Sequence, residues 1–317
     1  MIYVDYIIYT FESIINVINI CFCDLIYRLT YLLRLVYNKP ECKILLYMIG
    51  KDNMFKIALF NQKGGVGKSA ATVNLAGCLE REFKKRVLVM DCDAQQNSSL
   101  HLLNTRVDNT IRKILDGETT LEKSIYPVQL EVGNKLVNTK IDVLASGMDI
   151  DLLGPTDVKA YKKLTDQLEE KYDYCLIDCP PQKMATAITS LCACDYVLVP
   201  ILTETDESIQ GWDMVMDLVN ELKTNRLNET ISILGLLITR TNKTRKLDRQ
   251  LTEYCRSTFG DYLFDTTIRE AQDIRDSYMY RKPVVYYRKT CNVSKDYISA
   301  AKELIKRIDI RQRKVGV

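Results

Sequence analysis

The sequence of 317 residues is poor in the residues that mark several protein classes. It contains only 13 Gly and 7 Pro and shows no repeated period, which excludes collagen-like chains, repeat arrays and low-complexity chains. A single histidine, His101, and the lack of any C-x-x-C pair leave a structural zinc site without its usual ligands. The 11 Cys lie mostly in apolar runs, where a free thiol behaves as a small hydrophobic group. We therefore expect reduced cysteines and a cytoplasmic location.

No stretch has the 20 or so apolar residues, nearly free of charge, that a membrane-spanning helix needs. The nearest candidate, residues 6–23, is interrupted by Glu12 and flanked by Asp5 and Asp24. It also lacks the basic start and the small-residue cleavage site of a signal peptide. Residues 1–53 could be an amphipathic, weakly membrane-associated extension, a helix packed on the body, or the product of a start codon assigned upstream of Met54. The third interpretation is preferred because residues 55–61 form a first strand that needs nothing upstream.

Charge is nearly balanced over the whole chain, at +3, but it is unevenly distributed. Residues 54–239 carry 20 basic and 26 acidic side chains, whereas residues 240–317 carry 19 basic and 10 acidic ones. A basic C-terminal quarter, with a net charge of +9, predicts an acidic partner such as nucleic acid or a membrane surface.

Short apolar runs alternate with helical patterns from residue 57 onward. The runs lack polar alternation, so they predict strands buried on both faces, at 57–60, 87–90, 141–144, 174–177, 196–199 and 231–238. Helical patterns occupy 70–83, 158–170, 185–193, 208–222, 247–257 and 293–308. This order predicts an α/β fold with a doubly wound, mostly parallel sheet flanked by helices. Ligands bind such sheets beyond the C-terminal ends of the strands.

A glycine-rich motif, QKGGVGKS at residues 62–69, stands between the first expected strand and the first expected helix. That context is typical of a P-loop, whose backbone N–H groups and helix N-terminus bind phosphate oxygens. Lys68 can reach the β- and γ-phosphates of ATP, and the Ser69 hydroxyl can bind Mg²⁺. The predicted nucleotide-binding residues of this segment are Lys63, Gly64, Gly65, Val66, Gly67, Lys68, Ser69 and Ala70.

The motif departs from the plain P-loop pattern, because Gln62 occupies the first glycine position and an extra lysine, Lys63, follows it. This form resembles the deviant Walker A motif of the ParA/MinD family of dimeric ATPases. VLVMDCDAQQN at 87–97 resembles the D-x-D-P-Q-x-N segment of that family, and LIDCPP at 176–181 resembles its Walker B strand and switch II. The likeness covers about 54–308, including the K-P-V stretch at 282–284, and it implies a P-loop NTPase domain over residues 54–317.

The resemblance also implies roles for single residues. Lys63 is expected to cross a dimer interface to the partner's phosphates, and it joins Lys68 and Asp93 as the predicted catalytic residues. Asp93 is the candidate for positioning the attacking water. Asp178 is expected to hold Mg²⁺ through water, and Asp91 to support the magnesium shell. These roles predict ATP and Mg²⁺ as cofactors.

Two details qualify this assignment. Ala94 replaces the usual Pro of the second motif, which leaves the rate of hydrolysis undecided. Residues 236–242 resemble the segment near the adenine base, so Arg240 is added to the predicted nucleotide-binding residues.

Within the family the chain resembles the ParA branch of plasmid and chromosome partition proteins that lack an N-terminal helix-turn-helix. That branch implies a dimer formed on ATP, non-specific DNA binding, a nucleoid-associated location, and hydrolysis stimulated by a ParB-like centromere-binding protein. The predicted DNA-binding residues are Arg240, Lys243, Arg245, Lys246, Arg269, Arg275, Arg281 and Lys282. A MinD-like membrane-associated positioning ATPase is the alternative. Membrane binding is not expected, because the apolar stripe of residues 297–308 fits a helix packed on the sheet.

Overall fold

The structure is a computed structural model that describes residues 54–315 except 148–149, 151–152, 155–156, 182–184, 204 and 243. The chain divides into two compact units, and the unit Asp52–Arg311 carries the sheet and its helices. The other unit, Met1–Lys51 with Gln312–Val317, lies almost wholly outside the described residues. The predicted extension 1–53 falls there, so its boundary at Met54 stays a prediction.

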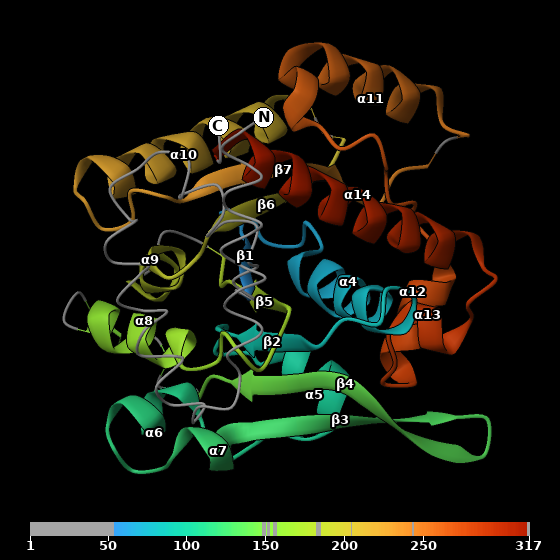
Figure 1. Cartoon of the computed structure of the whole chain (residues 1–317). Helices are drawn as coiled ribbons and strands as arrows, with labels where there is room; N and C mark the ends of the chain where they lie inside the picture. Colours follow the sequence, from blue (N-terminus) through green and yellow to red (C-terminus); the bar gives the residue numbers. More distant parts are fainter. Residues whose placement is uncertain are drawn as a thin grey trace, which may run out of the picture. The chain divides into compact units, whose positions relative to one another are not determined.

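Seven described strands form one sheet in the order β3-β4-β2-β5-β1-β6-β7 (Figure 1). Every neighbouring pair is parallel except β3 and β4, which form an antiparallel hairpin. The predicted doubly wound, mostly parallel sheet is confirmed. The strands are β1 (Phe55–Leu59), β2 (Val87–Asp91), β3 (Ile125–Val132), β4 (Lys135–Ala145), β5 (Tyr174–Asp178), β6 (Tyr196–Ile201) and β7 (Ser232–Ile238).

Helices cover both faces of the sheet because successive strand side chains point to opposite sides. On one face, Ala58 and Phe60 pack with α8, α9 and α10. On the other face, Ile57 and Leu59 pack with α4 and α14. The described helices are α4 (Lys68–Arg81), α5 (Asn97–Leu103), α6 (Ile111–Leu115), α7 (Leu121–Ser124), α8 (Val158–Asp166), α9 (Ala185–Cys192), α10 (Thr205–Thr224), α11 (Lys246–Phe259), α12 (Gln272–Met279), α13 (Val284–Tyr287) and α14 (Asn292–Val315).

The hairpin of β3 and β4 was not predicted from the sequence. β3 is an edge strand with alternating burial, in which Val128 and Leu130 face the core and their neighbours face outward. Such a strand contains no continuous apolar run, so that pattern does not predict it. β4 also starts at Lys135, six residues before the predicted run at 141–144, because its exposed first half pairs only with β3.

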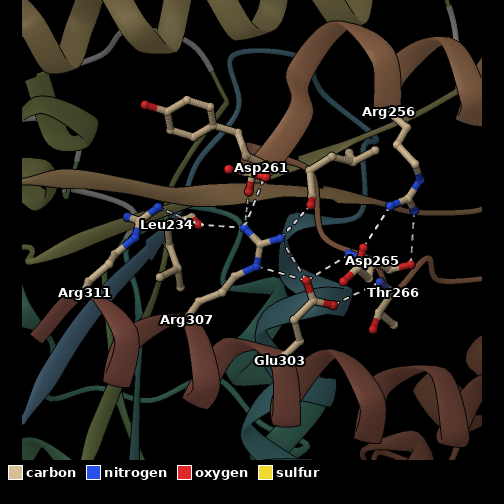
Figure 2. A network of polar contacts seen from close by, with 10 residues as sticks. Leu234, Arg256, Asp261, Asp265, Thr266, Glu303, Arg307 and Arg311 are labelled. Carbon is tan, nitrogen blue, oxygen red and sulfur yellow. Dashed lines mark hydrogen bonds and ion pairs between the residues drawn. The ribbon is translucent and has the colours of Figure 1, made fainter. Parts of the chain in front are cut away.

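A polar network joins α14 to β7 and to residues 261–266, which follow α11 (Figure 2). Arg307 donates to the carbonyls of Asp261 (2.8 Å) and Leu263 (2.5 Å), and Glu303 accepts from the backbone N–H of Asp265 (2.8 Å). The apolar stripe of α14 is buried on the sheet, as predicted, through Tyr297, Ala301, Leu304 and Ile308. Among the described residues, no helix is long and apolar enough to cross a membrane.

Candidate nucleotide-binding site

The P-loop joins the end of β1 to the first turn of α4, as the motif predicts. Gly65 and Gly67 have φ angles of 76° and 86°, a left-handed conformation that glycine adopts without a steric penalty. Gly67 is also the N-cap of α4, and its carbonyl accepts the first helical hydrogen bond, from Ala71 N (2.8 Å). The N–H groups of this first helical turn have no intrahelical partner, so the loop and helix together can bind phosphate oxygens.

Lys68 lies under the loop with 8% of its surface exposed. Its Nζ donates to the carbonyls of Asn61 (3.0 Å) and Lys63 (3.1 Å). An ammonium group has three N–H bonds, so the third can reach a phosphate oxygen. Burial lowers the pKa of Lys68, while the nearby carboxylate of Asp178 opposes that shift.

Two residues outside the predicted set hold the loop in place. The Asn61 side chain accepts from Lys63 N (2.9 Å) and donates to the Pro200 carbonyl at the end of β6 (2.8 Å). Thr239, just after β7, donates from its hydroxyl to the Val66 carbonyl (2.8 Å). Both sit where a strand ends, and that position is the only sequence signal that could have marked them.

Asp91 and Asp178 end the neighbouring strands β2 and β5 and lie side by side in register. Both are buried. One oxygen of Asp91 accepts from the N–H and hydroxyl of Ser99 (2.8 Å each), and one oxygen of Asp178 accepts from the Ser98 hydroxyl (2.7 Å). Burial raises the pKa of both carboxyl groups, and the neighbouring carboxylates add to the rise.

The other oxygen of Asp178, Oδ1, is buried and accepts no hydrogen bond. Such an oxygen is costly unless a ligand satisfies it. The Ser69 hydroxyl lies close enough to lower the pKa of this carboxyl group. A carboxylate and a hydroxyl fit Mg²⁺, which keeps several ligands from water and phosphate. Among the described residues, no cluster of three or more His, Cys, Asp or Glu could hold a metal by itself.

Asp93 follows β2 by two residues and is partly buried. Its carboxylate accepts from Gln95 N (2.9 Å), and its carbonyl accepts from the Ser146 hydroxyl (2.8 Å). Its charge acts on the pKa values of both Lys68 and Asp178. The structure therefore brings Asp93 to the same site as the P-loop lysine and the predicted magnesium carboxylate.

Arg240 contacts the P-loop directly. Its Nη1 donates to the Gly65 carbonyl (3.3 Å), and its Nη2 lies 4.0 Å from Glu270. A cavity of about 160 Å³ opens here between Gly67, Ala70 and the segment that follows β7. Glu270, which the sequence did not mark, faces both Arg240 and Arg275 (3.6 Å).

The predicted DNA-binding residues fall into different environments. Arg245 and Lys246 are exposed at the start of α11, whereas Arg281 and Lys282 are half-buried after α12. Arg269 donates twice to Asp296, at 2.6 and 2.8 Å, so its guanidinium is occupied within the fold. Lys243 lies outside the described residues. Arg240 and Arg275 face Glu270 but keep exposed side chains. The predicted residues thus fall into three places among the described residues: the start of α11, the surroundings of Glu270, and residues 281–282.

Comparisons with known proteins identify the family of the chain. A family model described as an AAA domain matches residues 54–233. The chromosome partitioning protein ParA of Caulobacter vibrioides is 31% identical over 267 residues, covering 82% of this chain and 97% of that protein. The sporulation initiation inhibitor protein Soj of Bacillus subtilis is 30% identical over 252 residues, covering 78% and 97%.

A solved structure gives the same result for the fold. The cell division ATPase MinD of Pyrococcus furiosus superposes with a TM-score of 0.63 at 25% identity, over 79% of this chain and 98% of that one. The mostly parallel seven-stranded sheet flanked by helices matches the fold of that ATPase. The chain belongs to the ParA/MinD family of P-loop ATPases.

Proposed function

We propose that this protein is a partition ATPase that binds ATP and Mg²⁺, dimerises on ATP, and binds DNA without sequence preference. One observation carries the proposal: Lys68, Asp93 and the orphaned oxygen of Asp178 converge at a P-loop that also contains Lys63. The relatives named ParA and Soj supply the biological context, because the chain covers 97% of each of them.

The proposed reaction is hydrolysis of the γ-phosphate. A water oxygen bonds to the γ-phosphorus, and the bond between that phosphorus and the bridging oxygen breaks. ADP leaves with the electron pair of that bond, and one proton of the water passes to a phosphate oxygen. Asp93 orients the water and accepts its hydrogen bond, while Lys68 neutralises charge on the phosphates. Ser69 and, through water, Asp178 would hold Mg²⁺, which would supply positive charge beside the phosphate oxygens.

Lys63 is proposed to act across a dimer interface. Asn61 fixes the backbone of Lys63, and the side chain is only partly buried in the single chain. A lysine in this position can reach phosphates that another subunit binds. The ATP-bound dimer would then have an additional positive charge at each reacting phosphate.

Non-specific DNA binding needs contacts with phosphates and no base readout, so exposed lysines and arginines are sufficient. Arg245 and Lys246 on α11 meet that requirement. A ParB-like centromere-binding protein is proposed to stimulate hydrolysis and release the DNA, which places the protein on the nucleoid in the cytoplasm.

The test is DNA binding to a mixed-sequence duplex in Mg-ATP and in Mg-ADP. We expect tighter binding in Mg-ATP, and weaker binding for the double variant Arg245→Ala/Lys246→Ala. Lys302→Ala, which removes an exposed charge from α14, serves as the matched control and should bind normally. Binding to anionic lipid vesicles in preference to DNA would contradict the proposal and support a MinD-like membrane role.

A further inference from the structure

Helix α5 begins at the nucleotide site. In its first turn, the Ser98 hydroxyl donates to Asp178 (2.7 Å), and the N–H and hydroxyl of Ser99 donate to Asp91 (2.8 Å each). Both carboxylates are buried, so these bonds are shielded from water. Any change in the Asp178 carboxylate that accompanies nucleotide and Mg²⁺ binding therefore acts directly on the start of this short helix.

The next turn of α5 contacts the basic segment after α12. The Nε2 of His101 lies 3.0 Å from the Lys282 carbonyl, and the imidazole packs edge-on against Tyr278 with 4.9 Å between ring centroids. His101 is buried, and that burial lowers its pKa to about 4. The ring is therefore neutral near pH 7, and its Nε2–H donates to the carbonyl.

Helix α4, which starts at the P-loop, anchors the two residues that follow Lys282. Asn74 on α4 accepts from Val284 N (2.6 Å). Gly77 lies so close to Pro283 that an added Cβ would be 2.4 Å from the proline ring. Residues 278–284 therefore contact two helices that both begin at the nucleotide site, α5 through Tyr278 and Lys282 and α4 through residues 283–284, so a shift of α5 relative to α4 would alter residues 278–282.

Arg281 shows that the segment is strained in this arrangement. Its φ is +53°, a left-handed conformation that is unfavourable for a residue with a side chain. One guanidinium nitrogen, Nη1, is buried without a hydrogen-bond partner, while the guanidinium lies 5.0 Å from the centre of the Tyr278 ring. A second arrangement of the side chain that exposes this nitrogen to water would relieve the cost of the unpaired donor. The neighbouring side chains of Met279 and Tyr280 are 78% and 61% exposed, so the segment lies at the surface.

From these contacts we propose that residues 278–282 are the nucleotide-responsive part of the DNA-binding surface, and that α5 controls them through His101. In the ATP state, Arg281 and Lys282 turn outward to bind DNA phosphates. Arg245 and Lys246 on α11 bind DNA in either nucleotide state. This inference rests on the proposed function, and it assigns the ATP dependence to one segment and one contact.

The first experiment compares the Kd for a short mixed-sequence duplex in Mg-ATP and Mg-ADP. His101→Phe keeps an aromatic ring but removes the hydrogen bond to Lys282. We expect it to reduce the ATP-to-ADP affinity ratio at least about 5-fold, the lower range of typical allosteric coupling. The affinity for ATP and the turnover without DNA should stay unchanged. The matched control Lys246→Gln should weaken binding in both states and leave the ratio as it is.

The second experiment uses the unsubstituted protein, so it does not depend on how a variant folds. His101 is the only histidine, so isotope-labelled histidine gives one imidazole signal in NMR. We expect Mg-ATP, without DNA, to shift that signal. An unshifted signal would overturn this inference and leave the proposed function intact. An unchanged ATP-to-ADP ratio of DNA affinities in folded His101→Phe would do the same. Equal DNA affinity in Mg-ATP and Mg-ADP for the unsubstituted protein would instead overturn the proposed function.

Discussion

Lys63 and Lys68 lie on one loop but have different environments. Lys68 is buried and donates to two loop carbonyls, one of which belongs to Lys63. Lys63 is partly exposed, and its backbone is fixed by Asn61. The loop therefore holds one lysine inside its own site and leaves the other at the surface, as action on a second subunit would require.

Replacement of Lys68 by alanine is expected to abolish nucleotide binding. The change removes a buried positive charge facing the phosphates, and such losses cost about 2–5 kcal/mol, at least about 30-fold in affinity. Titration with a fluorescent ATP analogue measures the effect. Lys85→Ala, a lysine on the loop before β2, is the control and should bind normally. Retained ATP affinity in Lys68→Ala would contradict the P-loop assignment.

Asp93→Ala is expected to slow hydrolysis while leaving ATP binding largely intact. Loss of a group that orients the attacking water lowers turnover by about 10²–10⁴-fold. Phosphate release measures turnover, and size-exclusion chromatography with ATP should show a persistent dimer. Unchanged turnover would remove Asp93 from the mechanism. Ala94→Pro restores the usual residue of the family motif next to Asp93, so its turnover shows how Ala94 affects the rate of hydrolysis.

At the scale of elements, the C-terminal helix is held by its polar side as well as by its apolar stripe. Arg307 lies over the Phe264 ring, 4.2 Å from its centre, and satisfies carbonyls of the 261–263 turn. Gly235 in β7 makes this close packing possible. A Cβ at that position would lie 2.5 Å from the Tyr262 carbonyl oxygen and 3.0 Å from the Arg307 guanidinium.

Arg307→Ala is expected to lower the free energy of unfolding by about 1–3 kcal/mol, because the partly buried carbonyl of Leu263 and the exposed carbonyl of Asp261 lose a charged donor. Urea unfolding monitored by circular dichroism measures this change. Lys306→Ala, at the neighbouring exposed position of the same helix, should change stability by less than about 0.5 kcal/mol. Equal effects of the two changes on the free energy of unfolding would show that the Arg307 network does not contribute to stability.

Elements with a single strong pattern were predictable, and those with mixed patterns were not. The six buried strands were found because their apolar runs are continuous. β3 was missed because it is half-exposed at the sheet edge and contains Pro127. The short helices α5, α6, α7 and α13 were missed because four to seven residues are too few for a clear helical period. α12 was missed although α9, of the same length, was predicted, because α12 is mostly polar whereas α9 is mostly apolar.

At the scale of the whole molecule, part of the positive charge of the C-terminal quarter is paired within the fold. Arg269 pairs with Asp296, Arg256 with Asp265, and Arg307 with Glu303. Net charge alone cannot separate them from arginines that meet a partner. The proposed DNA surface therefore depends on fewer residues than the value of +9 suggests.

DNA affinity should fall steeply with salt. If about three phosphates are neutralised per protomer, the affinity should fall about 40-fold between about 50 and 200 mM monovalent salt. Fluorescence anisotropy with a labelled duplex in Mg-ATP measures this slope. Arg245→Ala should reduce the slope by about one, whereas Arg256→Ala, whose guanidinium is paired in the fold, should leave it unchanged. A salt-independent affinity would contradict phosphate binding.

Dimer formation should depend on ATP and hydrolysis on Lys63. Lys63→Ala is expected to bind ATP normally as a single chain and to hydrolyse it more slowly, since the Lys63 charge is proposed to act on the phosphates that a partner subunit binds. Analytical ultracentrifugation in Mg-ATP measures dimer formation. It uses the Asp93→Ala background, which is expected to slow turnover and so keep ATP bound. Normal turnover in Lys63→Ala would contradict a role across the interface.

The sequence by itself determined the sheet, the P-loop and the strand-end carboxylates, because each is written in a short run of neighbouring residues. Its pattern also placed Asp91, Asp93 and Asp178 at one edge, since parallel strands end together. Only the tertiary structure decided which basic side chains form ion pairs within the fold. It pairs Arg269 and Arg307 within the fold and brings His101 to Lys282 across 181 positions of the chain. Contacts between distant segments depend on packing, which local residue patterns do not specify.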